Sequence, residues 1–359
     1  MGRIAGSEVG MFKKKPSKNT PPPGSELRPL ESNDPEKIRQ QVTAMLQGDP
    51  EDPARARNQV RLILIQAFAN QSFPLPARLE IGNILGKVGD PRFDPQFFFL
   101  PKDGQCGFIP IEAGEFVMGS DPNFDPHAYE EEEPQHAFSL PEYFIARWPV
   151  TVAQYRAFVQ DSGHKIDNDD SFKGGSNHPV GWVYWTDALA YCDWLTEKLR
   201  SSHGTPQVLW DRLSAGWRVT LPSEPEWEKA ARGTTGRIYP WGNEHTVEMA
   251  NTAESEIRIP SPVGAFWAWR SPFDVEDMSG NVWEWTRSRW VGRRSYPYPD
   301  TEAERAEREN LAAKGDPHVL RGGSFSDVAW NARCARRIGK NVYDRYPNHG
   351  FRTVISPPV

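Results

Sequence analysis

Between residues 34 and 105, apolar residues recur at the three- and four-residue spacing of amphipathic helices. Asp34-Pro35 offers an N-cap followed by proline at the first helical position, and Asp52-Pro53 repeats this start signal. A third helix is expected from Pro76 to Leu85. The pattern predicts a small helical N-terminal region that packs on a main domain. Residues 1–33 are rich in Lys, Pro, Ser and Gly, which favours a disordered basic tail.

From residue 106 to residue 359 the chain changes to short apolar runs that end at Gly and Pro, the pattern of strands joined by turns. Two helices are expected inside this domain, one capped by Thr151 and one from Thr186 to Leu199. The charged segment 300–316 reads as an exposed helical insertion or a mobile flap, with a solvated charged face as the preferred interpretation.

Charge and cysteine content exclude several classes of protein. The net charge of −6 argues against a general nucleic-acid surface, although the tail is locally basic. Three widely spaced cysteines without a C-x-x-C pattern argue against a disulfide framework or a structural zinc site. No apolar run approaches the roughly 18 residues of a membrane helix, and the N-terminus lacks the apolar core of a signal peptide. We therefore expect a cytoplasmic protein without a membrane span.

A series of short blocks, in a fixed order over roughly residues 106–356, resembles the formylglycine-generating enzyme (sulfatase-modifying factor) family. Residues 109–120 resemble its opening hairpin, and residues 321–325 and 350–352 resemble its C-terminal end. The remaining blocks are residues 149–158, 178–182, 218–228, 239–243 and 277–285. The resemblance implies an α+β domain with a C-type lectin-like fold. A fold does not by itself fix a function.

The residues for that family's oxygen chemistry are missing. The family holds copper with a pair of cysteines, the first placed two residues after the aromatic of its Gly-Gly-Ser-Tyr/Phe motif. Asp327 stands there in this chain, and no cysteine occurs between Phe325 and Arg333. Cys334 lies where family members often carry a structural residue. Cu(I) prefers soft sulfur ligands, so one carboxylate does not replace the pair, and no catalytic residue is expected.

The chain also contains candidate ligands for other metal ions. His127 and His136 flank an acidic run, but their spacing fits no ordinary zinc motif and a charged loop is the preferred interpretation. Sulfoxide synthases of this fold hold iron with histidines from added N-terminal helices, whereas all eight histidines here lie at or after His127. The resemblance also implies a structural calcium ion held by oxygens of Asn251, Asn281 and Glu284. Ordinary hydrogen bonding is the alternative for these three. Arg352 is expected to pair with a buried carboxylate.

The C-terminal segment alternates regular scaffold residues with side chains of another kind. The interspersed side chains resemble those of the variable proteins of diversity-generating retroelements, which display a hypervariable C-terminal surface on this fold. Large aromatic residues suit contact surfaces because they offer stiff, amphipathic area. The sequence therefore predicts a ligand-binding surface with four anchors and five surrounding residues. The anchors are Trp330, Tyr343, Tyr346 and His349, and the others are Ser326, Asp327, Val328, Ile338 and Lys340.

From the sequence we expect non-catalytic binding of a protein or other macromolecular ligand through this surface. A fixed binding module and a diversified variable protein both stay open. Two further alternatives are an oxygen-dependent oxidase of the formylglycine-generating type, and an accessory protein-recognition domain of a signalling or defence system that docks through its helical region.

Overall fold

The three N-terminal helices begin where their sequence signals lie. In the computed structural model, which describes residues 29–47, 52–290, 296–299, 301–312 and 315–358, they are α1 (Pro35–Gln47), α2 (Pro53–Phe68) and α3 (Leu75–Val88). The Asp34 carboxylate accepts a hydrogen bond from the backbone N–H of Glu36 at 2.8 Å, and Asp52 caps α2 through the N–H of Arg55. Most of the tail expected over residues 1–33 lies outside the described residues.

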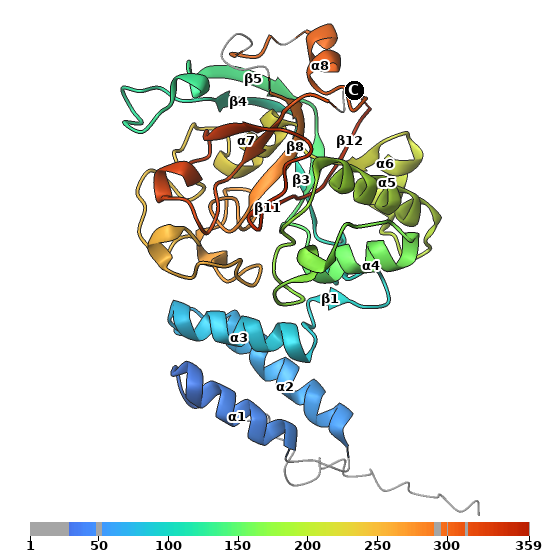
Figure 1. The fold of residues 1–359 in the computed structure, drawn as a ribbon, viewed down its shortest axis with the longest axis vertical. Helices are drawn as coiled ribbons and strands as arrows, with labels where there is room; N and C mark the ends of the chain where they lie inside the picture. The colour runs from blue at the N-terminus through green and yellow to red at the C-terminus, as the bar shows by residue number, and fades with distance from the viewer. Residues whose placement is uncertain (1–28, 48–51, 291–295, 300, 313–314, 359) are drawn as a thin grey trace, which may run out of the picture.

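The helical region packs on the main domain, as the sequence predicts. Figure 1 shows α1, α2 and α3 stacked below the sheets, with α3 nearest to them. Apolar residues of the three helices form one core with Ala265 and Phe266 of the main domain. Burial of Leu64, Ile81 and similar side chains in this shared core removes apolar surface from water and holds the two parts together.

Two four-stranded sheets form the frame of the main domain. The first has the order β3-β6-β12-β7 and is antiparallel throughout. The second has the order β10-β9-β8-β11, in which only the β8–β11 pair is parallel. The strands are β3 (Phe108–Ile111), β6 (Tyr143–Ala146), β7 (Arg218–Thr220), β8 (Trp283–Arg289), β9 (His318–Arg321), β10 (Arg337–Lys340), β11 (His349–Gly350) and β12 (Val354–Ser356).

The expected opening hairpin is wrong. Residues 109–120 do contain two strands, β3 and β4 (Gly114–Met118), but they pair with different partners. β3 pairs with β6, while β4 forms a separate two-stranded sheet with β5 (His136–Leu140). A further short pair joins β1 (Phe93–Asp94) to β2 (Leu100–Pro101). Apolar alternation identifies strands but not their partners, which depend on contacts distant in sequence.

Helices α4 (Val152–Ser162), α5 (Trp185–Ser201), α6 (Gln207–Ser214) and α7 (Glu224–Arg232) complete the main domain. Thr151 is the N-cap of α4, as predicted, and forms a full capping box with Gln154. Ser223 forms a second capping box at the start of α7. The largest apolar core joins α4 and α5 to both four-stranded sheets through residues such as Trp185, Tyr191 and Trp285. The mixture of helices and sheets agrees with the predicted α+β class.

The charged insertion is only partly solvated. It contains α8 (Glu302–Arg308), so its helical character is confirmed. The predicted solvated charged face holds for Glu302, Glu304 and Glu307, which are exposed, whereas Arg308 and Glu309 are buried. Glu309 accepts hydrogen bonds from Arg287 at 2.8 Å and from Arg308 at 3.0 Å. This ion-pair cluster fastens the C-terminal end of α8 to β8.

Candidate functional site

A polar cluster joins the two loops that carry most of the predicted site residues. Asn348 Nδ2 donates to Ser324 Oγ at 3.0 Å and to Ser326 Oγ at 3.1 Å. Ser324 in turn donates to the carboxylate of Asp327. These bonds hold residues 324–332, which follow β9, beside residues 341–348, which precede β11. The C-terminal surface is therefore built by two loops on the second sheet.

The turn after β9 requires its two glycines. Gly322 and Gly323 have φ values of 96° and 70°, a conformation that side chains with a Cβ rarely adopt. A Cβ on Gly323 would lie 2.8 Å from the Cα of Ala332. Gly323 thus lets the loop after β9 pack directly against the backbone of Ala332.

Asp327 is a bound carboxylate rather than an open position. Its Oδ2 accepts a hydrogen bond from the indole Nε1 of Trp283 at 2.8 Å as well as the bond from Ser324. Its backbone carbonyl accepts from the N–H of Ala253 at 2.8 Å. Asp327 therefore fixes the loop to β8 and to the 253–255 turn.

The three cysteines of the chain are all buried and lie in core clusters. Cys106 and Cys192 belong to the largest core, and Cys334 to the core around Trp227. Burial raises the pKa of Cys106 and of Cys334 to about 12, and raises the pKa of Cys192 well above its usual value. Only the thiolate is a strong nucleophile and metal ligand, so these thiols are poorly suited to either role at neutral pH.

Three of the four predicted anchors are exposed. The exposed fractions are 41% for Trp330, 71% for Tyr343 and 45% for Tyr346. The Trp330 ring stacks on the ring of His127 with a centroid distance of 5.6 Å. The amine of Lys340 lies 5.5 Å from the centroid of the Tyr346 ring, within cation–π range. These contacts hold the exposed rings of Trp330 and Tyr346 in place for contact with a ligand.

The fourth anchor, His349, is not at the surface. Its side chain is 3% exposed and lies against the rings of Trp285 and Tyr346. Burial, together with the nearby Lys340, lowers the pKa of His349 to about 3, so the imidazole is neutral. The prediction of His349 as an exposed anchor is wrong, because β11 is paired with β8 and turns this side chain inward.

The surrounding residues differ in their exposure. Ser326 is exposed, while Asp327, Val328, Ile338 and Lys340 are half-buried. Ile338 packs against the largest core from β10, so it supports the surface more than it presents one.

The acidic loop before β5 is tied to the C-terminal segment, a link that the sequence did not reveal. Arg333 pairs with Glu132 at 2.7 Å and with Asp125 at 2.6 Å. Arg336 pairs with Glu131 at 3.0 Å, and its guanidinium lies 3.8 Å from the centroid of the Tyr129 ring. The two segments have opposite charge, because one is an acidic run and the other is rich in arginine. This complementary charge is the feature of the sequence that could have indicated the contact.

This pairing explains the acidic run without a metal. Among the described residues, no three His, Cys, Asp or Glu side chains gather in a way that would hold a metal ion. His136 donates from Nδ1 to the carbonyl of Pro134 at 2.9 Å, and His127 stacks on Trp330.

The three residues expected to bind calcium are engaged in hydrogen bonds with other groups of the protein. The carboxylate of Glu284 accepts two hydrogen bonds from Arg352, at 2.6 and 2.7 Å, and a third from Trp227 Nε1 at 2.7 Å. The Asn281 side-chain oxygen accepts from the backbone N–H of Ser261 at 3.0 Å. Asn251 lies next to Asn281, with 3.4 Å between Nδ2 and Oδ1. The expected pairing of Arg352 with a buried carboxylate is confirmed, and calcium binding stays a prediction.

Comparison with models of protein families shows which family the chain belongs to. A model of the sulfatase-modifying factor enzyme 1-like domain matches residues 100–357. The chain belongs to this family. Its fold is the C-type lectin-like fold of the formylglycine-generating type, as the sequence predicted. No helix among the described residues has the length and apolar character needed to cross a bilayer.

Relatives in the family include both enzymes and a protein named as inactive. The chain is 32% identical to the hercynine oxygenase of Mycolicibacterium smegmatis, over 60% of this chain and 53% of that one. It is 27% identical to the inactive C-alpha-formylglycine-generating enzyme 2 of Bos taurus, over 68% of this chain and 86% of that one. The chain spans about half the length of the hercynine oxygenases that it matches.

A solved structure shares the fold. The variable protein 1 of Treponema denticola superposes with a TM-score of 0.53 at 22% identity, covering 70% of this chain and 95% of that one. Family membership therefore establishes the fold. Whether this chain catalyses a reaction or only binds a ligand has to be inferred from its own side chains.

Proposed function

We propose that this family member is a non-catalytic binding protein that holds a protein or other macromolecular ligand on its C-terminal surface. The observation that carries the proposal is the exposure of Trp330, Tyr343 and Tyr346 on two loops that Asn348 joins through hydrogen bonds. Aromatic residues on a stiff support are typical of binding hot spots, because little conformational entropy is lost on contact.

The state of the family's catalytic position supports the same proposal. Asp327 replaces the first thiol and is engaged by Trp283 and Ser324. The cysteines present are buried with raised pKa values. The relative from Bos taurus whose name calls it inactive is a precedent for a non-catalytic member.

A finer hypothesis is that the surface is diversified, as in the variable proteins of diversity-generating retroelements. The fold shared with the Treponema denticola variable protein is compatible with it. Sequencing the DNA around the gene is the test. A near-copy of the stretch encoding residues 318–356, differing mainly at adenines and lying beside a reverse transcriptase gene, would support diversification. If no such copy exists, a fixed binding module is the better description.

An oxygen-dependent enzyme is the second candidate, favoured by the 32% identity to a hercynine oxygenase. Assays of oxygen consumption with hercynine or with a cysteine-containing peptide, after loading with iron or copper, separate it from the binding proposal. The binding proposal expects no turnover above that of the free metal.

The proposal itself is tested by affinity capture with matched variants of the full chain. Immobilised wild type is compared with a Trp330→Ala/Tyr346→Ala variant and with Trp210→Ala, which removes an equally exposed tryptophan from α6 (43% exposed). A ligand retained by wild type and by Trp210→Ala, and lost by the double variant, is the expected result. Equal retention by all three would refute the assignment.

A further inference from the structure

A cavity of about 500 Å³ lies where the helical region meets the main domain, away from the C-terminal surface. Its walls come from α2, from residues 89–102, from the start of α4 and from residues 176–177. Cavities of roughly 300–1,000 Å³ between structural units are the usual size and place of small-molecule sites. The cavity therefore has the dimensions of a binding site.

The charged groups around the cavity leave an excess of positive charge. Arg61 donates to the carbonyl of Val88 at 2.7 Å and to the side-chain oxygen of Asn58 at 3.2 Å, and neither partner is an anion. Lys102 has no ion-pair partner among the described residues. The third charged residue of the wall, Asp90, is neutralised by Arg92 at 2.7 Å and also accepts from Asn177 at 2.9 Å.

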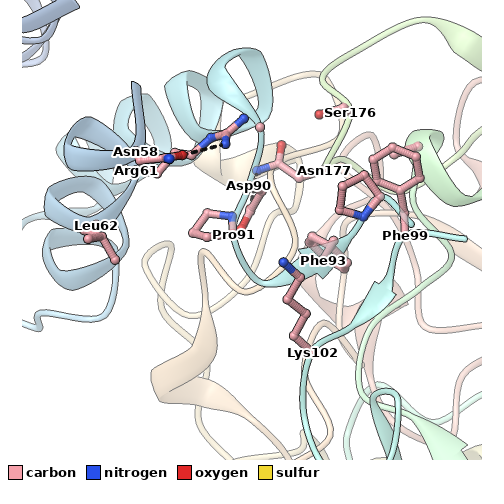
Figure 2. A pocket seen from close by; sticks show the side chains of 13 residues that line it. Asn58, Arg61, Leu62, Asp90, Pro91, Phe93, Phe99, Lys102, Ser176 and Asn177 are labelled. Atoms are coloured by element: carbon pink, nitrogen blue, oxygen red, sulfur yellow. Dashed lines mark hydrogen bonds between the residues drawn. The ribbon is translucent and has the colours of Figure 1, made fainter. Parts of the chain in front are cut away.

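The opposite wall is aromatic. Figure 2 shows Arg61 on one side of the cavity and Phe93 and Phe99 on the other, with the amine end of Lys102 between Pro91 and Phe93. Phe99 has a φ of 55°, a left-handed conformation that bulky residues rarely adopt. Strained backbone of this kind persists where the surrounding structure holds it, often beside ligands.

Gly89 leaves space for the guanidinium of Arg61. Gly89 has a φ of 92°, and a Cβ at this position would lie 2.3 Å from Nη2 of Arg61. Any other residue here would push the guanidinium away from its present position across the end of α3.

We propose that this cavity binds a small organic anion, which the positive charge of Arg61 and Lys102 attracts and whose flat apolar body lies against Phe93 and Phe99. The site is independent of the C-terminal surface, because none of the predicted surface residues lines it. Two cations supply the attraction for the anionic group, and the rings bury the apolar part.

The test is ligand-observed NMR on the full chain with phenyl phosphate and benzoate as probes, and with inorganic phosphate and benzyl alcohol as partial mimics. Saturable binding of an aromatic anion is expected with a Kd of about 1 mM or tighter. Each partial mimic is expected to bind at least about tenfold more weakly, because it lacks either the charge or the ring.

Two variants assign the binding to this cavity. Lys102→Met removes an exposed charge without breaking a side-chain contact, and is expected to weaken binding about fivefold. Ala153→Leu narrows the cavity from α4 and is expected to weaken binding at least about tenfold. Lys37→Met on α1 is the matched control and should leave binding unchanged. Loss of affinity in either cavity variant with an unchanged control supports the proposal. Absence of saturable binding by both aromatic anions, or equal affinity in all variants, overturns it.

Discussion

The indole Nε1 of Trp283 donates a hydrogen bond of 2.8 Å to the carboxylate of Asp327, the residue that stands in the family's first cysteine position. Trp283 lies on β8 and Asp327 follows β9, so this bond ties the loop to the centre of the second sheet. The Asp327 carboxylate thus has a structural use in this chain.

The first prediction concerns the thiols. Because all three cysteines are buried, the folded chain is expected to react slowly with a thiol-reactive probe, whereas unfolding in denaturant releases all three. Cu(I) titration against a chromophoric chelator should show no tight site in the folded protein. Stoichiometric Cu(I) binding that is lost on replacing Cys106 or Cys334 would contradict the account.

The second prediction separates binding from folding. Replacing Trp330 and Tyr346 by alanine should leave the free energy of unfolding within about 1 kcal/mol of wild type, because both side chains are more than 40% exposed. The measurement is urea denaturation, with Trp210→Ala as the control. A loss of folding in the double variant would show that these residues are structural.

The third prediction concerns the buried pair of Arg352 and Glu284. Arg352→Met leaves the Glu284 carboxylate buried without its cation, and should lower the free energy of unfolding by about 3–5 kcal/mol. The exposed pair of Arg270 and Asp274 provides the control, where Arg270→Met should cost at most about 1 kcal/mol. Chemical denaturation measures both. Similar costs at the two sites would contradict the role given to the buried pair.

The fourth prediction is an acid-sensitive stability. Burial lowers the pKa of His349 to about 3 and that of His178 and His318 to about 4, from an ordinary value of 6.5. Each of these lowered pKa values means that the folded state favours the neutral imidazole. The contribution of these histidines to the free energy of unfolding is therefore full above pH 6.5 and is lost as the pH drops toward the pKa of the folded state. Burial raises the pKa of Asp277 to about 7, so this carboxyl group stabilises the folded state more as the pH falls. The combined effect of the three histidines is larger than that of this one carboxyl group.

The free energy of unfolding should therefore be lower at about pH 5 than at about pH 7, and Asp277→Asn should make this loss steeper. Nitrogen-detected NMR of the histidine rings should show His349 still neutral at the lower pH. A protonated His349 in the folded state at about pH 5 would contradict its burial.

Local signals in the sequence were sufficient for much of the fold. Asp34, Asp52 and Thr151 are caps whose bonds span only two or three residues, so their helices could be predicted from adjacent residues. Long-range pairing could not be predicted in this way. The separation of β3 from β4 depends on their partners β6 and β5.

In the candidate site, too, the sequence did not predict contacts between residues that are distant in the chain. The exposure of Trp330 and Tyr343 agrees with the predicted surface. His349 was misassigned because its place depends on the parallel pairing of β11 with β8. The pairing of Arg333 with Glu132 was missed because 201 residues separate them.

Hydroxyl-radical footprinting of the full chain, with and without a ligand recovered by affinity capture, tests the central claim most directly. The account predicts that the ligand protects Trp330, Tyr343 and Tyr346 from oxidation and leaves Trp210 unchanged. Protection confined to α1–α3, for example at the exposed Leu62, would contradict the account and favour docking through the helical region.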